Sequence, residues 1–269
     1  MLLDCATHGL GVGNWEDENW SGEANFLKKL LIKYVRTDTP VFIDIGANVG
    51  DYSLWLRRQY PNSKILAFEP NPKTFAKLRQ AIRDDKTILI DKGLGATEGI
   101  LPFFDRRDCE GSSGHGSLYE EVITGIHKAD AVRVDVRITT FDRVLQERSI
   151  NRVSLLKIDT EGHELEVLRG AEKSLRKGLI DVIQLEFNET NIVSKVFFRD
   201  LMEFLPEYVP YRLLPKGVLK LKYSPSSTEL FLYQNLVFVH ERFRPNKAME
   251  PGIDPASAVG DLKTSRVPL

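Results

Sequence analysis

The chain has 269 residues, of which 42% are hydrophobic and 28% are charged, as in an ordinary globular protein that can build a full core. The 37 Lys and Arg residues nearly cancel the 38 Asp and Glu residues, which argues against nucleic acid or an anionic membrane as a partner. No run approaches about 18 apolar residues and no signal-peptide pattern is present, so we expect no membrane span and a cytoplasmic protein.

Residues 1–36 are expected to form an N-terminal arm followed by a cap helix. Residues 1–20 show no periodic pattern and are interpreted as a cap or mobile arm. From Ser21, a candidate N-cap, apolar residues recur at helical spacing as far as Tyr34. Cys5 and Cys109 are far apart and outside any metal-ligand spacing, so both are expected to be unpaired thiols.

From Val41 to just before Pro61, the sequence changes from an apolar run to a small-residue loop and then to an amphipathic pattern, which predicts a strand, a tight turn and a helix. Gly46 and Gly50 allow the sharp turn, and the helix start attracts a ligand with negative character. A dinucleotide-binding loop has the pattern G-x-G-x-x-G, but here Asn48 replaces the middle glycine. Asp44, two residues before the first glycine, suits a ligand that carries an ammonium group.

A second apolar run ends at Glu69, whose carboxylate could accept both hydroxyl hydrogens of a ribose. Together with Asp44, it suggests a nucleoside with an amino-acid end. A helix and a third strand at residues 87–91 follow, and this alternation predicts βαβ crossovers and a parallel sheet. Asp91, which closes the third strand, is a candidate to lie near the adenine of such a nucleoside. The alternative is that it is a turn-forming acid before Gly93.

The alternation is interrupted at residues 101–140, which we interpret as an insertion at the rim of the sheet. A Gly- and Ser-rich stretch at residues 111–117 precedes a strictly alternating strand at residues 132–138. Loops of this kind often close over substrates, and His115 could reach one, although a solvated loop histidine is the simpler alternative.

The remaining chain resumes the alternation before its composition changes. The expected elements are strands at 153–159 and 181–187, helices at 163–176 and 191–205, and final strands near 211–222 and 235–240. Residues 241–269 are rich in Pro, Ser, Lys and Asp and are interpreted as a surface wrap or a disordered tail.

Ionisable residues cluster where the fourth strand ends, at Lys157, Asp159, Glu161 and His163. Ligands of open α/β sheets bind beyond the carboxyl ends of the strands, so this cluster is expected to share a crevice with the first turn. His163 could remove a proton from a hydroxyl, with Asp159 or Glu161 orienting it or acting directly. Helix-dipole stabilisation of Glu161 and a structural ion pair of Lys157 are the alternatives.

Glu186 ends the fifth strand, where an acid is costly unless it is paired or lies in a cleft. It could bind acceptor hydroxyls or join Asp159 as a magnesium ligand. Two scattered acids form no metal signature, so no metal site is predicted.

Three blocks of the sequence resemble the FkbM family of S-adenosylmethionine-dependent methyltransferases. They are DIGANVG at 44–50, FEPNP at 68–72 and LLKIDTEGHELEVLRGA at 155–171, in the family's order. The resemblance spans roughly residues 21–239. It implies an α/β fold of class I methyltransferase (Rossmann-like) type in residues 37–240, with a mostly parallel seven-stranded sheet, helices on both faces and a reversed edge. The N-terminal helix would then cover the cofactor or the acceptor, which makes Gly22 and Glu23 further candidates; the alternative is that Glu23 is an exposed acid in the first helical turn, stabilised by the helix dipole.

The resemblance implies S-adenosylmethionine as cofactor and a hydroxyl of a sugar, glycan precursor or natural product as acceptor. The expected cofactor-binding residues are Asp44, Gly46, Ala47, Asn48, Gly50, Glu69, Pro70 and Asp91, and the catalytic candidates are Lys157, Asp159, Glu161, His163 and Glu186. One alternative is a nicotinamide-dependent oxidoreductase, which would lack the usual glycine at Asn48. Another is a non-catalytic nucleoside-binding protein. The sequence does not indicate an oligomeric state.

Overall fold

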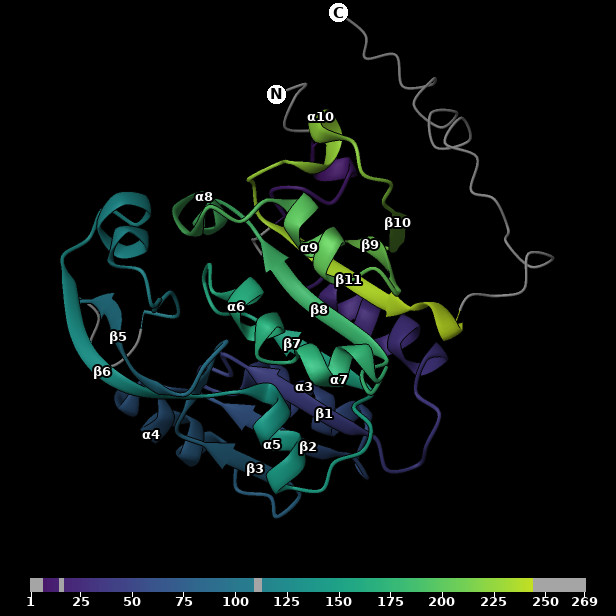
Figure 1. The fold of residues 1–269 in the computed structure, drawn as a ribbon, viewed down its shortest axis with the longest axis horizontal. Coiled ribbons are helices and arrows are strands. Elements are labelled where there is room, and N and C mark those ends of the chain that lie inside the picture. Colours follow the sequence, from purple (N-terminus) through teal and green to yellow (C-terminus); the bar gives the residue numbers. More distant parts are fainter. Residues whose placement is uncertain (1–6, 15–16, 109–112, 244–269) are drawn as a thin grey trace, which may run out of the picture.

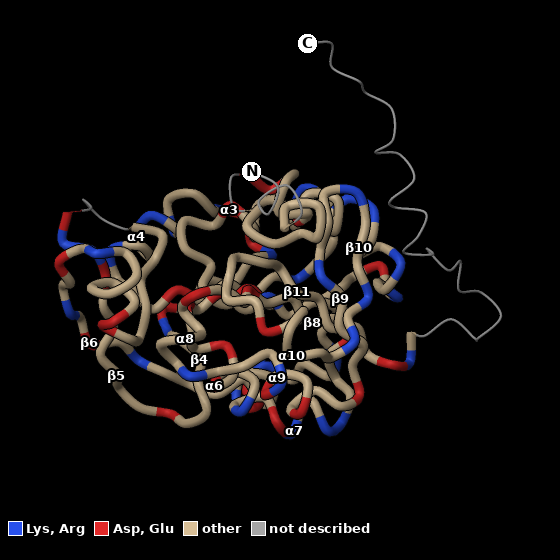
Figure 2. Tube along the Cα trace, turned by 90° about the horizontal axis from the view of Figure 1, so that it is seen from above, with Lys and Arg blue, Asp and Glu red and all other residues tan. Residues whose placement is uncertain are grey.

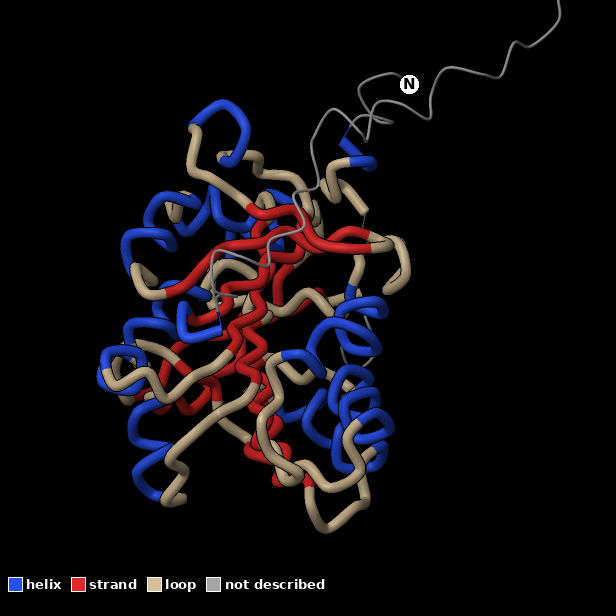
Figure 3. The backbone as a smooth tube through the Cα atoms, turned by 90° about the vertical axis from the view of Figure 1, so that its right-hand side faces the viewer, coloured by secondary structure: helices blue, strands red, loops and turns tan. Residues whose placement is uncertain are grey.

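The computed structural model describes residues 7–14, 17–108 and 113–243. Within these residues, eight strands form one sheet in the order β10-β9-β11-β8-β7-β1-β2-β3. Helices cover both faces of this sheet (Figures 1 and 3), which confirms the predicted α/β class. Both signs of charge are distributed around the molecule, in agreement with the balanced composition (Figure 2). Cys5 and Cys109 lie outside the described residues.

The central strands of the main sheet are parallel. They are β1 (Val41–Ile45), β2 (Lys64–Phe68), β3 (Thr87–Ile90), β7 (Leu155–Ile158) and β8 (Val182–Phe187). The chain runs from β1 outward to β3 and returns to β7 on the other side of β1. The strand order therefore reverses between β1 and β7, and a crevice is expected beyond their carboxyl ends.

Each face of the sheet has its own set of helices. The helices α3 (Asp51–Gln59) and α4 (Pro72–Ala81) connect β1, β2 and β3 on the face that also carries the N-terminal helical segment. The opposite face packs against α5 (Phe141–Glu147), α6 (Glu164–Arg169), α7 (Glu172–Arg176) and α9 (Phe198–Phe204). None of the described helices is long and apolar enough to cross a membrane.

The reversed edge is confirmed, but it contains one more strand than expected. β11 (Gln234–His240) pairs antiparallel with β8 and with β9 (Tyr208–Leu214). The predicted strand at 211–222 is instead a hairpin of β9 and β10 (Gly217–Lys220). Pro215, which has no N–H to donate, interrupts the ladder, and the chain reverses before Gly217. The main sheet therefore has eight strands rather than seven.

Two predicted helices are each divided in two. The segment from 163 to 176 breaks between α6 and α7 at Gly170, where a Cβ atom would lie 2.1 Å from the carbonyl oxygen of Gly95. The segment from 191 to 205 is split into α8 (Thr190–Ser194) and α9, with Lys195 in the left-handed region at a φ of 58°. Neither break interrupts the apolar periodicity, so periodicity alone predicted continuous helices.

The N-terminal segment packs onto the sheet. Residues 7–14 are not a mobile arm, because Val12 and Asn14 are buried and the N–H of Gly13 donates to the carbonyl of Tyr233 at 2.7 Å. The helical segment that follows comprises α2 (Glu23–Asn25), η1 (Phe26–Leu30) and η2 (Leu31–Lys33). Its N-cap is Gly22 rather than Ser21, with a φ of 85°. A Cβ atom on Gly22 would lie 2.7 Å from the carbonyl oxygen of Leu214, so glycine permits this close approach.

The rim segment forms a second, smaller sheet of β4 (Gly93–Leu94), β6 (Ala131–Thr139) and β5 (Gly99–Arg106). This smaller sheet lies beside the main sheet (Figure 1), and the helical turn η3 (Val122–Ile126) lies in the connection between β5 and β6. The alternating strand predicted at 132–138 is present as β6, but its partner β5 was not expected. The two other short elements are α10 (Pro225–Thr228) and η4 (Glu241–Phe243), and the rest of the predicted tail lies outside the described residues.

Candidate functional site

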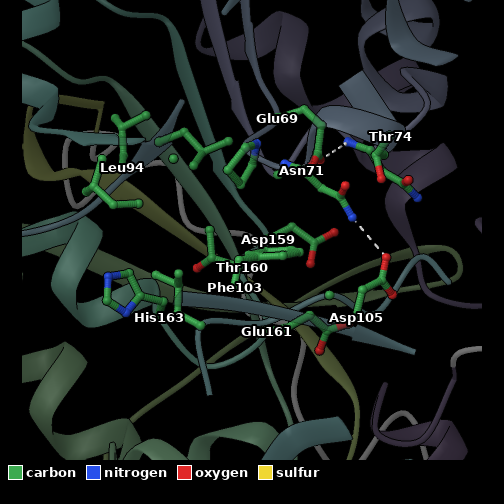
Figure 4. A pocket seen from close by; sticks show the side chains of 18 of the residues that line it. Glu69, Asn71, Thr74, Leu94, Phe103, Asp105, Asp159, Thr160, Glu161 and His163 are labelled. Atoms are coloured by element: carbon green, nitrogen blue, oxygen red, sulfur yellow. Dashed lines mark hydrogen bonds between the residues drawn. The ribbon is translucent and has the colours of Figure 1, made fainter. Parts of the chain in front are cut away.

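A cavity lies beyond the carboxyl ends of β1, β2 and β7, at the reversal of strand order. Figure 4 shows side chains from both sheets converging on it. The main sheet contributes residues such as Gly46, Glu69 and Asp159, and the rim sheet contributes Phe103 and Ile138. The cavity therefore has a polar floor and a partly apolar cover, an arrangement that is typical of small-molecule sites.

The first turn depends on Gly46. Its φ is 79°, and a Cβ atom would lie 1.8 Å from the carbonyl oxygen of Asp159. The N–H groups of Gly46 and Ala47 both donate to the carbonyl of Phe68, which ties the turn to the end of β2. Because only glycine can pass so close to β7, this residue sets the distance between the two sides of the cavity.

Glu69 connects this turn to the start of α4. Its carboxylate accepts hydrogen bonds from the N–H groups of Asn48 at 3.1 Å and Asn71 at 2.8 Å. Burial raises its pKa to about 7, although these two N–H groups favour the charged form. The side-chain amide of Asn71 donates to Asp105 of β5 at 2.9 Å, which links the main sheet to the rim sheet (Figure 4).

The expected cofactor-binding residues fall into two groups. Gly46, Asn48, Glu69 and Pro70 line the cavity, whereas Asp44, Ala47, Gly50 and Asp91 are not among its lining residues. Ala47 and Gly50 face the core between α3 and α4, in contact with Ala67, Leu78 and Ile82. Asp91 points outward and pairs with Arg137 of β6 at 2.5 Å. The roles assigned to these residues stay predictions.

Asp44 is fully buried beneath the turn. Its Oδ2 accepts a hydrogen bond from the hydroxyl of Ser53 at 2.6 Å, while its Oδ1 has no hydrogen-bond partner among the described residues. Burial raises the pKa of Asp44, and nearby Lys157 partly opposes this effect. A buried carboxylate oxygen without a donor is costly, so it favours a ligand or water that can donate to it.

Lys157 is buried and forms an ion pair with the partly exposed Asp159, with 2.7 Å between Nζ and Oδ2. The ammonium also lies 4.9 Å from the centre of the Tyr52 ring. Burial alone would lower the pKa of Lys157, but Asp159 and the acids Glu23, Glu186 and Asp44 together raise it above its ordinary value. Lys157 therefore stays protonated at neutral pH.

His163 does not interact with the acids that were expected to orient it. Its Nδ1 lies 3.2 Å from the hydroxyl of Tyr119, whereas Glu161 lies 3.4 Å from Nδ1 of His115. The reason is that Glu161 and Gly162 both have positive φ, so the chain turns sharply between Asp159 and His163. Burial lowers the pKa of His163 to about 4, which leaves the ring neutral at neutral pH.

A neighbouring acid holds this loop in place. The Oε1 atom of Glu164 accepts hydrogen bonds from the N–H groups of Thr160 and Gly162, each at 3.1 Å. Burial raises the pKa of Glu164 to about 7, and these N–H donors oppose the shift. Glu164 thus positions the loop that carries Glu161 and does not face the cavity.

A second cleft opens on the other side of Asp159, between the N-terminal segment, α3 and β8. Its lining comprises Glu18, Glu23, Asp51, Tyr52, Leu54, Trp55, Arg58, Lys157, Asp159 and Glu186. Asp159 lines both the cavity and this cleft. A group bound in one would therefore be close to a group bound in the other.

Several polar residues that help to build this cleft were not predicted from the sequence, among them Tyr52, Gln184, Tyr233 and Asn235. Gln184 and Asn235 are buried and lie on neighbouring strands. Polar residues at alternating positions of otherwise apolar strands, such as Gln184 and Glu186 in β8, are the signal that could have found this polar sheet face. Among the described residues, no group of three or more His, Cys, Asp or Glu is arranged to hold a metal ion.

Comparison with known proteins gives a consistent set of relatives. A family model described as the methyltransferase FkbM domain matches residues 44–213. Methyltransferase sdnD of Sordaria araneosa is 35% identical over 158 residues, which cover 50% of this chain and 61% of that protein. Hexuronic acid methyltransferase AglP of Haloferax volcanii is 26% identical, over 64% of this chain and 65% of that protein.

A further relative is matched over more of its length. The 2-O-methyltransferase NoeI of Sinorhizobium fredii is 23% identical over 202 residues, which cover 70% of this chain and 80% of that protein. The crystal structure of a methyltransferase FkbM from Methylobacillus flagellatus superposes with a TM-score of 0.48 and 13% identity, over 82% of this chain and 50% of that chain. The chain thus spans less than two thirds of the length of sdnD and AglP.

Proposed function

Because the chain belongs to the methyltransferase FkbM domain family, we propose that it transfers the methyl group of S-adenosylmethionine to a hydroxyl of a sugar, glycan precursor or natural product. The relatives named as a hexuronic acid methyltransferase and a 2-O-methyltransferase support a sugar-like acceptor. The single observation that carries the proposal is the position of Asp159, which lines both the cavity and the second cleft.

The residues around the cavity suit this cofactor. Glu69, at the tip of β2, offers a carboxylate to the ribose hydroxyls, and the turn at Gly46 lets the backbone approach the ligand. Leu94, Phe103 and Ile138 provide the apolar surface that an adenine needs. The unpartnered Oδ1 of Asp44 is a ready acceptor for a donor beneath the turn. When bound, S-adenosylmethionine would supply an electrophilic methyl group on its sulfonium.

The protein's own task is to align the acceptor oxygen, exclude water and remove one proton. Asp159 is the proposed base, and Lys157 holds its Oδ2 atom at 2.7 Å. Lys157 itself is protonated and cannot take this proton. His163 is assigned to the wall of the cavity near Gly95 and not to proton transfer, because its ring forms a hydrogen bond with the hydroxyl of Tyr119 and none with a carboxylate.

Two measurements test the proposal. Isothermal titration should show binding of S-adenosylmethionine and of its demethylated product S-adenosylhomocysteine, and no comparable heat with NAD. Incubation with methyl-labelled S-adenosylmethionine and a metabolite extract should place label on a hydroxyl. Binding of NAD without S-adenosylhomocysteine would favour the oxidoreductase alternative, and binding of S-adenosylhomocysteine without transfer to any acceptor would favour a non-catalytic protein.

A further inference from the structure

The face of the main sheet beneath the N-terminal segment carries a row of polar side chains. Strand register places Asp44 beside Lys157 and Lys157 beside Gln184. Two residues further along β8, Glu186 lies beside Asn235 of β11. A sheet face covered by a helix is normally apolar, and this one is apolar towards its other end, at Phe42, Leu155 and Val182. The polar row therefore occupies only the end that faces the second cleft.

Hydrogen bonds hold this row in one arrangement. The hydroxyl of Tyr52 donates to Oε1 of Gln184 at 2.5 Å, and Nε2 of Gln184 donates to Oε1 of Glu23 at 2.7 Å. On the other side, the hydroxyl of Tyr233 donates to Glu186 at 3.2 Å and accepts from Asn235 at 3.0 Å. Glu23 from the N-terminal segment and Glu186 from β8 are thus fixed in the same cleft.

The cleft is lined by more acidic than basic residues. Five acids line it, Glu18, Glu23, Asp51, Asp159 and Glu186, against the two cations Arg58 and Lys157. Lys157 is already paired with Asp159. Burial raises the pKa of Glu23, and burial followed by repulsion from Asp159 raises that of Glu186 well above its ordinary value. A bound cation would relieve this repulsion, whereas a bound carboxylate would increase it.

The remaining walls are aromatic and apolar. Tyr52, Leu54 and Trp55 of α3 line the cleft beside the acids. Aromatic rings attract cations and pack against the apolar faces of ring-shaped ligands. The cleft therefore combines an aromatic and apolar wall with an acidic end, and it meets the proposed cofactor cavity at Asp159.

From this combination we propose that the second cleft binds the methyl acceptor and selects a hydroxylated compound that carries an ammonium group, such as an amino sugar, over a carboxylated one. Glu186 and Glu23 are the specificity-determining residues. The acceptor hydroxyl faces Asp159, and the ammonium lies towards Glu186. The assignment of the bound compound as a methyl acceptor rests on the proposed function, but the charge preference of the cleft can be measured without catalysis.

The test is titration of the full chain with glucosamine, glucose and glucuronic acid at neutral pH, with and without S-adenosylhomocysteine. These probes share a ring and differ in charge. We expect glucosamine to bind at least about tenfold more tightly than glucuronic acid, with glucose between them. Glu186→Gln and Glu23→Gln should each reduce this ratio, while Glu203→Gln, an exposed acid on α9, should leave it unchanged. A melting temperature close to that of the unmodified chain would show that each variant is folded.

Equal binding of the three compounds, preference for glucuronic acid, or no binding of any of them would each overturn the inference. A ratio that Glu186→Gln and Glu23→Gln both leave intact would also overturn it. Failure of S-adenosylhomocysteine to bind would instead count against the proposed function, because the sugar titrations are also made in its absence.

Discussion

The two cavities that meet at Asp159 are built in different ways. The proposed cofactor cavity is formed mainly by short continuous segments, with backbone N–H groups and a glycine turn at its centre. The second cleft is formed by side chains from the N-terminal segment, α3, β7 and β8. In the hydrogen bond between Gln184 and Glu23, the two residues are 161 positions apart in the chain.

This difference suggests how the two sites tolerate change. A turn that depends on one backbone conformation fails when its glycine is replaced, whatever the ligand. A cleft made of separate side chains can lose one of them and keep its shape, so that single substitutions change selectivity rather than remove binding. Substitutions at the residue that both sites share and at the glycine of the turn should therefore differ in their effects.

Asp159→Asn should have the largest effect on turnover. Removing the proposed base should lower kcat by about 100- to 10000-fold while the affinity for S-adenosylhomocysteine changes less than about threefold. Labelled methyl transfer and isothermal titration measure the two quantities. Asp135→Asn, at an exposed acid of β6, is the matched control and should change neither. A parallel loss of affinity and turnover would show that Asp159 belongs to the cofactor side alone.

Gly46→Ala should weaken binding of S-adenosylhomocysteine by about 100-fold, because a strained or displaced turn would lose a few kcal/mol of binding free energy. The new Cβ atom would lie 1.8 Å from the carbonyl oxygen of Asp159, at a φ of 79°. Thermal unfolding should show a lower melting temperature as well. Gly99→Ala in β5 is the control, because nothing lies within 4 Å of its added Cβ atom. Normal binding by the Gly46 variant would contradict the account of the turn.

Glu69 gives a prediction of pH dependence. Its pKa is raised from 4.5 to about 7, so the folded chain binds more protons than the unfolded chain between these values. The contribution of Glu69 to stability is therefore fully present below pH 4.5 and is lost as the pH rises through 7. The upper limit of this effect is about 3 kcal/mol, and Glu69→Gln should remove it from the pH profile of urea unfolding.

Cofactor affinity should change with pH in the opposite direction. If the ribose hydroxyls donate to the Glu69 carboxylate, binding of S-adenosylhomocysteine should strengthen as the pH rises through about 7. Glu69→Gln should weaken binding by about tenfold above this pH and flatten the profile. An unchanged pH profile in the variant would mean that Glu69 only supports the turn.

The sequence was sufficient to predict the elements that depend on local sequence patterns. The strand, turn and helix around Gly46 follow from spacing within one segment, and Asp159 follows from the rule that ligands lie beyond strand ends. The helix break at Gly170 depends on a contact with a distant residue, and so does the role of Glu23. Such contacts leave no local pattern, which is why the second cleft could not be predicted in detail.

Substitution of Asp91 should have the smallest effect. This residue was expected near the adenine because it closes β3, but its side chain is 53% exposed and pairs with Arg137, which is 58% exposed. An ion pair this exposed contributes less than about 1 kcal/mol. Asp91→Asn should therefore change the affinity for S-adenosylhomocysteine by less than about twofold, against about tenfold for Glu69→Gln. Similar losses from both variants would show that the rim sheet shifts on binding and brings Asp91 to the cofactor.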